Sequence, residues 1–363
     1  IADNRATLAW LRGKPFPELR VGWLDATSPG CELPGSGGVG LARKTGADSV
    51  LAAWREASPH QVSRRAILHL DADTTVEPNY LATVAGALLT EGYDACTPAF
   101  AHQAAGDAGA QEAIDSYELF LRYYVEGLRL AGSPYAFHTL GSAMASTADA
   151  YVRAAGIPAK RQAGEDFYFL QQLAKNGSVV ALGQTIVHPS ARQSGRAPFG
   201  TGQRVRELLA GDAVATGYDP RTFGILRALF QAVAARPFDS AAAILTSVQE
   251  PEAREFLERQ RFALTWGKLQ DQHRSQVAMV RAFHVWFDAL ATVRLVRHLA
   301  RTSLPPPGLL EAWQGLIAGA AVTAPPITTP ARFLDWARQR QGEHAVFGAG
   351  CRVSALDLLS SQG

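Results

Sequence analysis

The stretch Ala66-Ile-Leu-His-Leu-Asp71-Ala-Asp73-Thr74 places two carboxylates directly after a near-continuous apolar run. Such a run is typical of a central parallel strand that is covered on both faces. Ligands of open α/β folds bind at the carboxyl ends of these strands, so we expect Asp71 and Asp73 at a binding edge. Paired carboxylates need a cation or a shared proton, and oxygen ligands suit Mg²⁺ or Mn²⁺. The alternative is a solvated pair that caps the next helix.

Around this stretch, short apolar runs alternate with helical periodicity, which indicates an α/β fold with a mostly parallel sheet flanked by helices. The predicted strands are 19–24, 66–70, 95–100, 178–182 and 185–187. The predicted helices are 6–12, 46–57, 77–91, 111–131, 147–155 and 165–175. Beyond about 215 the patterns are almost all helical. We therefore predict an α/β domain over 1–215 and an all-α domain over 216–363.

The composition is that of an ordinary globular protein large enough for two domains, with 363 residues, 47 % hydrophobic and 19 % charged. The net charge of +2 argues against a dedicated nucleic-acid binder. Cys31, Cys96 and Cys351 show no metal-ligand spacing and imply no disulfide framework. The apolar stretch 316–324 is far shorter than the ~20 residues of a membrane span. We expect a cytoplasmic protein, whose arginines also permit peripheral docking on anionic lipid at the inner membrane face.

Three further features could carry chemistry. Glu165 and Asp166 open an amphipathic segment, where they either favour a helix N-terminus or supply a general base. His188 follows a strand-like run, as a metal ligand or as an ordinary polar contact. Arg192 and Arg196 lie in a segment rich in Gly, Pro, Ser and Arg, where they could clamp a diphosphate.

Five pieces then occur in a fixed order along the chain: a strand ending in Asp25, Ala42-Arg43-Lys44, Asp71-Ala-Asp73-Thr, Gly141-Ser142 and Gly164-Glu-Asp166. In this order they resemble the family 2 glycosyltransferases, which have the GT-A fold of nucleotide-diphospho-sugar transferases. The resemblance covers about residues 1–205. It implies a hexosyltransferase-like enzyme that moves a sugar from a nucleoside-diphosphate sugar to a carbohydrate or other hydroxyl acceptor, with Mn²⁺ or Mg²⁺ as cofactor.

The resemblance also implies a role for each matching residue. The nucleotide sugar would contact Asp25, Arg43, Lys44, Asp71, Asp73, Arg192 and Arg196. The metal would be held by Asp71, Asp73 and His188. Asp166 would be the general base of a single inverting displacement, with Glu165 in support, and the acceptor side would be formed by His138, Gly141 and Ser142. A retaining mechanism stays open, because retaining enzymes of this fold share the carboxylate pair and the late histidine.

The chain departs from the family in three places, one of which is the helical region after 215, which nothing in the family fixes. Only Ile1–Asn4 stands where the family has its first strand, so we expect that strand to be cut off. Processive synthases carry QxxRW and membrane helices, whereas Gln193-Ser-Gly-Arg-Ala197 has no tryptophan, which favours non-processive transfer. The helical domain would either cover the acceptor cleft or form a homodimer.

Other classes compete with this interpretation. Asp71-Ala-Asp-Thr-Thr75 fits the DxDxT of HAD-like phosphohydrolases, with Asp71 as nucleophile, but Lys175 follows the acidic pair instead of preceding it. Gly35-Ser-Gly-Gly-Val-Gly40 matches GxGxxG, but it does not follow its strand directly, as the dinucleotide fingerprint requires. A non-catalytic protein that binds nucleotide sugars is the third alternative.

Overall fold

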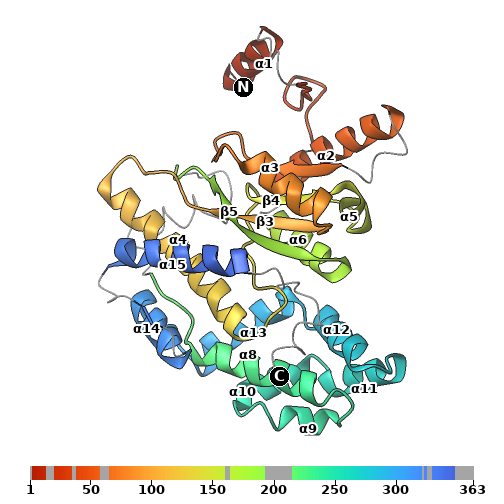
Figure 1. Cartoon of the computed structure of the whole chain (residues 1–363), viewed down its shortest axis with the longest axis vertical. Helices are drawn as coiled ribbons and strands as arrows, with labels where there is room; N and C mark the ends of the chain where they lie inside the picture. Colours follow the sequence, from red (N-terminus) through yellow and green to blue (C-terminus); the bar gives the residue numbers. More distant parts are fainter. Residues whose placement is uncertain are drawn as a thin grey trace.

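The computed structural model of the chain describes residues 2–13, 20–34, 38–57, 65–159, 164–192, 215–320, 323–324 and 329–347 (Figure 1). The helices are α1 (Ala2–Gly13), α2 (Gly38–Ala57), α3 (Tyr80–Ala85), the π-helix η2 (Gly86–Thr90), α4 (Ala108–Leu130), α5 (Ala148–Arg153), α6 (Glu165–Asn176), α8 (Arg221–Ala235), α9 (Ala241–Leu245), α10 (Pro251–Arg259), α11 (Phe262–Gln272), α12 (Gln276–Trp286), α13 (Ala289–Thr302), α14 (Leu309–Gly319) and α15 (Pro330–Phe347). The strands are β1 (Ala66–His69), β2 (Thr75–Val76), β3 (Ala95–Phe100), β4 (Met144–Thr147) and β5 (Val179–His188).

The five strands form one mixed sheet in the order β1-β4-β3-β5-β2. Only β3 and β5 pair in parallel, while the other three pairings described are antiparallel. The expectation of a mostly parallel sheet is therefore wrong for this part of the chain, although the α/β class is confirmed. β4 runs between β1 and β3 against the direction of both, and β2 pairs antiparallel with β5.

Strand β1 was expected at the centre of the sheet, and this is also wrong for the described residues. It pairs only with β4, in a register that joins Ala66 to Thr147 and His69 to Met144. Its side chains alternate between half-buried and buried, with Ile67 and His69 facing the interior. The two short strands expected near 180 form a single strand, β5. Its register with β3 shifts between Pro98 and Ala99, which leaves residues 183–185 without a register partner on β3.

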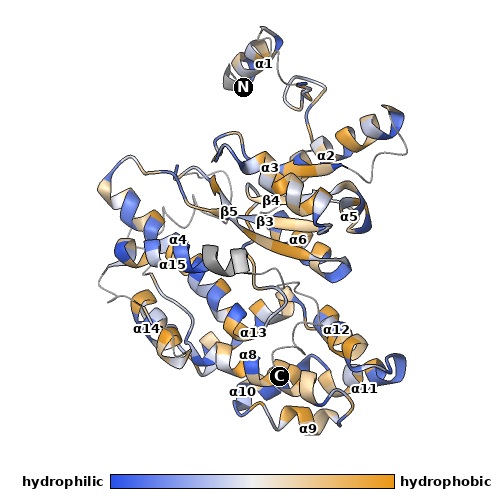
Figure 2. Ribbon diagram, in the orientation of Figure 1, coloured by the Kyte–Doolittle hydropathy of each residue, from blue (hydrophilic) through white to orange (hydrophobic). Residues whose placement is uncertain are grey.

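The helices cover both faces of the sheet. One apolar cluster joins α2, α5 and α6 to β1 and β4, and the other joins α3 and η2 to β3, β4 and β5. Figure 2 shows the apolar residues along β5 and α3. The start of each of two helices is fixed by a side-chain cap, since Asp107 accepts a hydrogen bond from the N–H of Ala110 at α4, and Thr147 accepts one from the N–H of Ala150 at α5.

The strand expected over 19–24 does not form in the described residues 20–24. Val21, Trp23 and Leu24 are 45 %, 41 % and 55 % exposed, and no strand pairing is recorded for them. Apolar residues favour a strand only where a partner strand satisfies their backbone groups. In Figure 1 this segment and α1 stand apart from the sheet, at the top of the view.

The helices from α8 to α14 surround the largest apolar cluster of the described chain, which also includes Leu119, Tyr123 and Leu128 of α4. α4 also contacts the sheet, since Arg122 donates a hydrogen bond to the carbonyl of Phe100 at the end of β3. The last helix, α15, returns from the helical region to pack on α4 and β5. Ion pairs fasten it there, Arg338 with Glu118 at 2.7 Å and Arg340 with Glu126 at 2.9 Å.

Candidate functional site

The two carboxylates lie on a turn between β1 and β2, as expected from their position after the apolar run. The N–H of Thr74 donates to the carbonyl of Asp71 at 3.0 Å and closes this turn. The side chains of Asp71 and Asp73 are 46 % and 40 % exposed. The next helix, α3, has Asn79 as its N-cap residue, so neither aspartate caps it. The alternative of a helix-capping pair is therefore wrong.

Arg43 of α2 reaches this turn and connects it to two distant segments. Its Nη2 forms an ion pair with Asp71, and its Nη1 donates to the carbonyl of Gly141 at 2.6 Å. Its Nε lies 3.3 Å from Oε1 of Glu165, and the side chain is only 11 % exposed. A Cβ on Gly141 would lie 2.7 Å from Nη2 of Arg43, so a larger residue at this position would displace the guanidinium. Three other predicted site residues thus meet at the guanidinium of Arg43.

The second acidic pair opens α6, as predicted. Gly164 precedes the pair with φ of +108°, a backbone conformation that residues other than glycine rarely adopt. The side chain of Glu165 is 5 % exposed, and Oδ1 of Asp166 accepts a hydrogen bond from the N–H of Phe167 at 2.7 Å.

The surroundings of Asp166 raise its pKa from 3.8 to about 6. Burial is the largest cause and the charge of Glu165 the second, while backbone hydrogen bonds from Phe167 and Gly141 and the charge of Arg43 act in the opposite direction. Burial and the charge of Glu165 therefore raise the pKa of Asp166 more than the backbone hydrogen bonds and Arg43 lower it. A carboxylate with a pKa near 6 is suited to accept a proton close to neutral pH.

His69 also lies next to Arg43 and α6, although no sequence pattern indicated that it belongs to the site. Its ring packs edge-on against Phe169 of α6, with 6.0 Å between ring centroids, and its Nε2 is buried without a partner. Burial and the charge of Arg43 lower its pKa to about 4, so the ring is neutral at physiological pH. Its position on β1 two residues before Asp71 is the only signal that could have identified it.

His188 lies at the end of β5 and pairs in register with Thr75, directly after the carboxylate turn. Its Nε2 is 2.9 Å from Oε1 of Glu77, and its Nδ1 is 3.1 Å from the carbonyl oxygen of Ala101. Sequence reasoning did not include Glu77. Both ring nitrogens of His188 therefore face oxygen acceptors in this structure.

Arg192 joins the same edge, since its Nη2 donates to Oδ2 of Asp73 at 2.7 Å. The structure therefore brings Asp73, His188 and Arg192 to one edge of the sheet, as the sequence predicted. The side chain of Arg192 is 63 % exposed, so this ion pair is open to solvent and to competing ions. Arg196 lies outside the described residues.

Two of these residues have the oxygen donors that a divalent cation prefers, although each of the two is paired with an arginine. No cluster of three or more His, Cys, Asp or Glu placed to hold a metal occurs in the part of the chain that the structure describes. Mg²⁺ commonly needs only one or two carboxylates, because it keeps waters and binds substrate phosphates. Asp71 and Asp73 offer that donor type on an exposed turn. His188 could join only if its nitrogen left Glu77.

The remaining predicted nucleotide contacts have local partners. Oδ1 of Asp25 accepts hydrogen bonds from the N–H groups of Thr27 and Ser28, both at 3.0 Å, and hydrogen bonds from Ser28 and Thr27 lower the pKa of Asp25 to about 2. Asp25 thus closes its own turn and ends no strand. Nζ of Lys44 lies 2.9 Å from Oδ2 of Asp48 on the same helix.

The residues expected on the acceptor side are divided. Gly141 contacts Arg43, as described above, and Ser142 is buried beside it. His138 instead faces α15, where its Nε2 lies 2.9 Å from Oε1 of Gln341. Burial and the charge of Arg122 lower the pKa of His138 to about 3. His138 therefore contacts α15 and is not among the residues that meet at Arg43.

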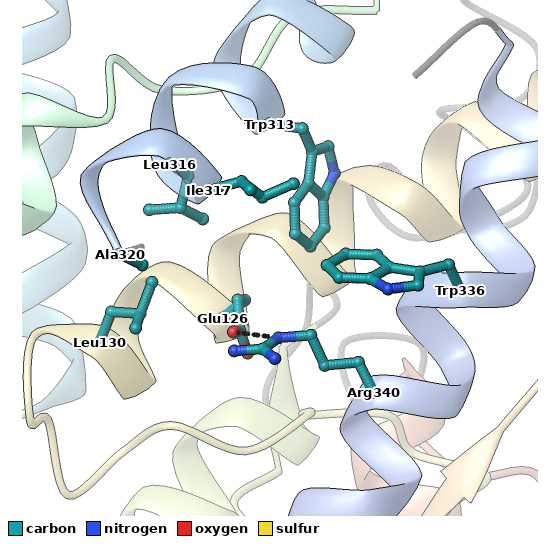
Figure 3. A pocket seen from close by; sticks show the side chains of 8 residues that line it. All are labelled: Glu126, Leu130, Trp313, Leu316, Ile317, Ala320, Trp336 and Arg340. Atoms are coloured by element: carbon teal, nitrogen blue, oxygen red, sulfur yellow. Dashed lines mark hydrogen bonds and ion pairs between the residues drawn. The ribbon is translucent and has the colours of Figure 1, made fainter. Parts of the chain in front are cut away.

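The helical side of the molecule has a shallow pocket between α4, α14 and α15 (Figure 3). Trp313, Trp336 and Ile317 line it, and the ion pair between Arg340 and Glu126 closes one side. None of its lining residues is an acidic residue of the candidate site or Arg43.

The glycines at 35–37 of the GxGxxG match lie outside the described residues. Lys175, the candidate lysine of a phosphohydrolase, pairs with Asp288 at 2.5 Å. It lies ten residues after Glu165 on α6, which is about 15 Å along the helix. None of the helices in the described part of the chain has both the length and the apolar character to span a bilayer. No family model, curated protein or solved structure matches this chain.

Proposed function

We propose that this protein is a cation-dependent glycosyltransferase that moves a sugar from a nucleoside-diphosphate sugar to an acceptor hydroxyl. The observation that carries the proposal is the meeting of Asp71, Arg43 and the acidic pair at 165–166, which come from three distant segments. This arrangement combines the turn that carries Asp71, the guanidinium of Arg43 and a candidate base, Asp166, whose pKa is raised towards neutrality. The order of the sequence motifs supports the same class.

In this proposal Asp166 accepts the proton of the acceptor hydroxyl while that oxygen bonds to the anomeric carbon. The bond from this carbon to the donor diphosphate breaks, and the electron pair leaves with the diphosphate. Attack from the face opposite the leaving group inverts the anomeric configuration. Asp71 and Asp73 would hold a hard cation, which would neutralise the charge of the leaving diphosphate. Arg192, open to solvent beside Asp73, adds a bidentate phosphate contact.

The test is isothermal titration of the protein with a panel of nucleoside diphosphates, with and without Mn²⁺. We expect one nucleotide to bind, and more tightly with the metal. Absence of binding in both conditions would refute the proposal. Nucleotide binding with no transfer to any hydroxyl of an acceptor panel would instead identify a non-catalytic nucleotide-sugar-binding protein. Where transfer occurs, NMR of the product decides the mechanism, since a product with the donor's anomeric configuration excludes single inversion.

A further inference from the structure

The segment that follows β3 lies between the two halves of the candidate cation site. Nε2 of Gln103 donates to the main-chain carbonyl of Asp73 at 2.9 Å and to that of His188 at 2.8 Å. The N–H of Gln103 donates to the carbonyl of Pro189 at 2.9 Å. One side chain thus joins the carboxylate turn to the end of β5.

The two carbonyls match the chemistry of this amide. A primary amide has two N–H donors on one nitrogen, so a single group can satisfy both acceptors. β2 contains only two residues and pairs with β5 at Thr75 and Val76, and the contacts of Glu77 with His188 and of Arg192 with Asp73 join side chains, so the Gln103 amide is the link that holds the main-chain carbonyls themselves. The amide therefore fixes the main chain of Asp73 relative to that of His188.

Gln103 is itself held from behind by a buried carboxylate. Oε2 of Glu118 accepts a hydrogen bond from the N–H of His102 at 2.9 Å and lies 2.9 Å from Nδ1 of the same residue. Arg122 and Arg338 neutralise Glu118, at 2.8 and 2.7 Å. The side chain of Glu118 is 1 % exposed, so breaking this network is costly. The position of residue 102, and hence of Gln103, is set by packed structure.

We propose that Gln103 is a positioning residue of the candidate cation and diphosphate site. It sets the distance between Asp73, which would bind the cation, and the strand end that carries His188. This inference rests on the proposed function, because it assigns Gln103 a role toward the cation of that reaction. Gln103 offers the cation no carboxylate or imidazole, and its effect is exerted through the main chain of its two partners.

The test compares Gln103→Met with a matched control, Gln111→Met. Gln111 stabilises the segment between β3 and α4 in which Gln103 lies. Its Oε1 accepts a hydrogen bond from the N–H of Ala105 at 2.9 Å, and its Nε2 donates one to Asp115 at 2.8 Å. Each substitution therefore removes two hydrogen bonds from one region, but only Gln103 reaches the site. Nucleotide affinity is measured by titration with and without Mn²⁺, and hydrogen exchange of the metal-free proteins is followed by mass spectrometry.

For Gln103→Met we expect the Mn²⁺-dependent affinity for the nucleoside diphosphate to fall by ~10–100-fold, the usual effect of losing a partner behind metal ligands. We also expect faster exchange in peptides covering 71–76 and 186–190, with the metal-free affinity unchanged. Gln111→Met should show neither effect. Wild-type affinity and exchange in Gln103→Met, or equal losses in both variants, would overturn the inference alone. A wild-type protein that binds no nucleotide would overturn the proposed function, and the role of Gln103 with it.

Discussion

The substitution Arg43→Met tests how the acidic cluster is stabilised. Arg43 is the cation that faces both Asp71 and Glu165, and the consequences at the two carboxylates differ because their burial differs. Asp71 is 46 % exposed and can be solvated by water, whereas Glu165 is 5 % exposed and would remain as a buried charge that has lost this partner. Removing one partner of a buried pair costs about 3–5 kcal/mol. We expect a loss of unfolding free energy of that order at pH 7.5.

The loss should also depend on pH. The pKa of Asp166 is already raised to about 6, and Arg43 is one of the groups that hold it down, so it rises further in the variant. A carboxyl whose pKa is higher in the folded than in the unfolded protein contributes stability only while it is protonated. That contribution is complete below about pH 4 and is lost as the pH rises through the folded pKa. Arg43→Met should therefore lose less stability at pH 5 than at pH 7.5.

Urea unfolding at the two pH values measures both effects. Arg192→Met is the matched control, because its ion pair with Asp73 is exposed on both sides and should contribute at most about 1 kcal/mol. The double variant Arg43→Met with Glu165→Gln should recover part of the loss, since the buried charge is then removed. A loss that is independent of pH, or no larger than that of Arg192→Met, would refute this account of the cluster.

Three further predictions concern single residues. Asp166→Asn should keep nucleotide affinity and lose transfer by ~10²–10⁴, as expected for a general base; near-wild-type turnover would show that Asp166 has no such role. Asp73→Asn should lose the Mn²⁺-dependent part of nucleotide binding in titration, and unchanged metal dependence would contradict its assignment. His284 is buried, and neither of its ring nitrogens has a hydrogen-bond partner among the described residues. Burial lowers its pKa to about 3. The folded protein therefore loses stability as the pH falls below about 6.5, by up to about 1.4 kcal/mol of unfolding free energy per pH unit. His284→Phe should therefore raise unfolding free energy more at pH 4.5 than at pH 7.5 in urea titrations, and an equal gain at both values would exclude this cause.

The parts of the fold that were predictable are those set by neighbouring residues. The apolar run before Asp71, the periodicity of α4 and the acidic start of α6 all depend on local sequence, and the structure has each of them. The sheet order was not predictable in this way. It depends on β4 pairing with both β1 and β3, and contacts between segments distant in sequence leave no local pattern.

The candidate site shows the same division. Asp71, Asp73, Glu165 and Asp166 were recognisable because strand ends and helix starts are where such residues act. The partners of these residues were not recognisable. Glu77, Gln103 and His69 are single polar residues with no distinctive spacing, and each gains its role from a side chain or carbonyl brought next to it by the tertiary fold.

The attachment of α15 has a consequence for the order in which the chain is assembled. α15 is the last described element to leave the ribosome, yet Arg338 and Arg340 are the partners of two carboxylates on α4 that are buried in the finished protein. Until α15 is synthesised, Glu118 and Glu126 lack these two partners and rely on the arginines of α4 itself, Arg122 and Arg129. A chain that stops at residue 329 would keep both carboxylates without the arginines of α15, with the exposed surface of α4 available for aggregation. Shortened forms made for crystallisation should consequently retain α15, even though most of the fold precedes it.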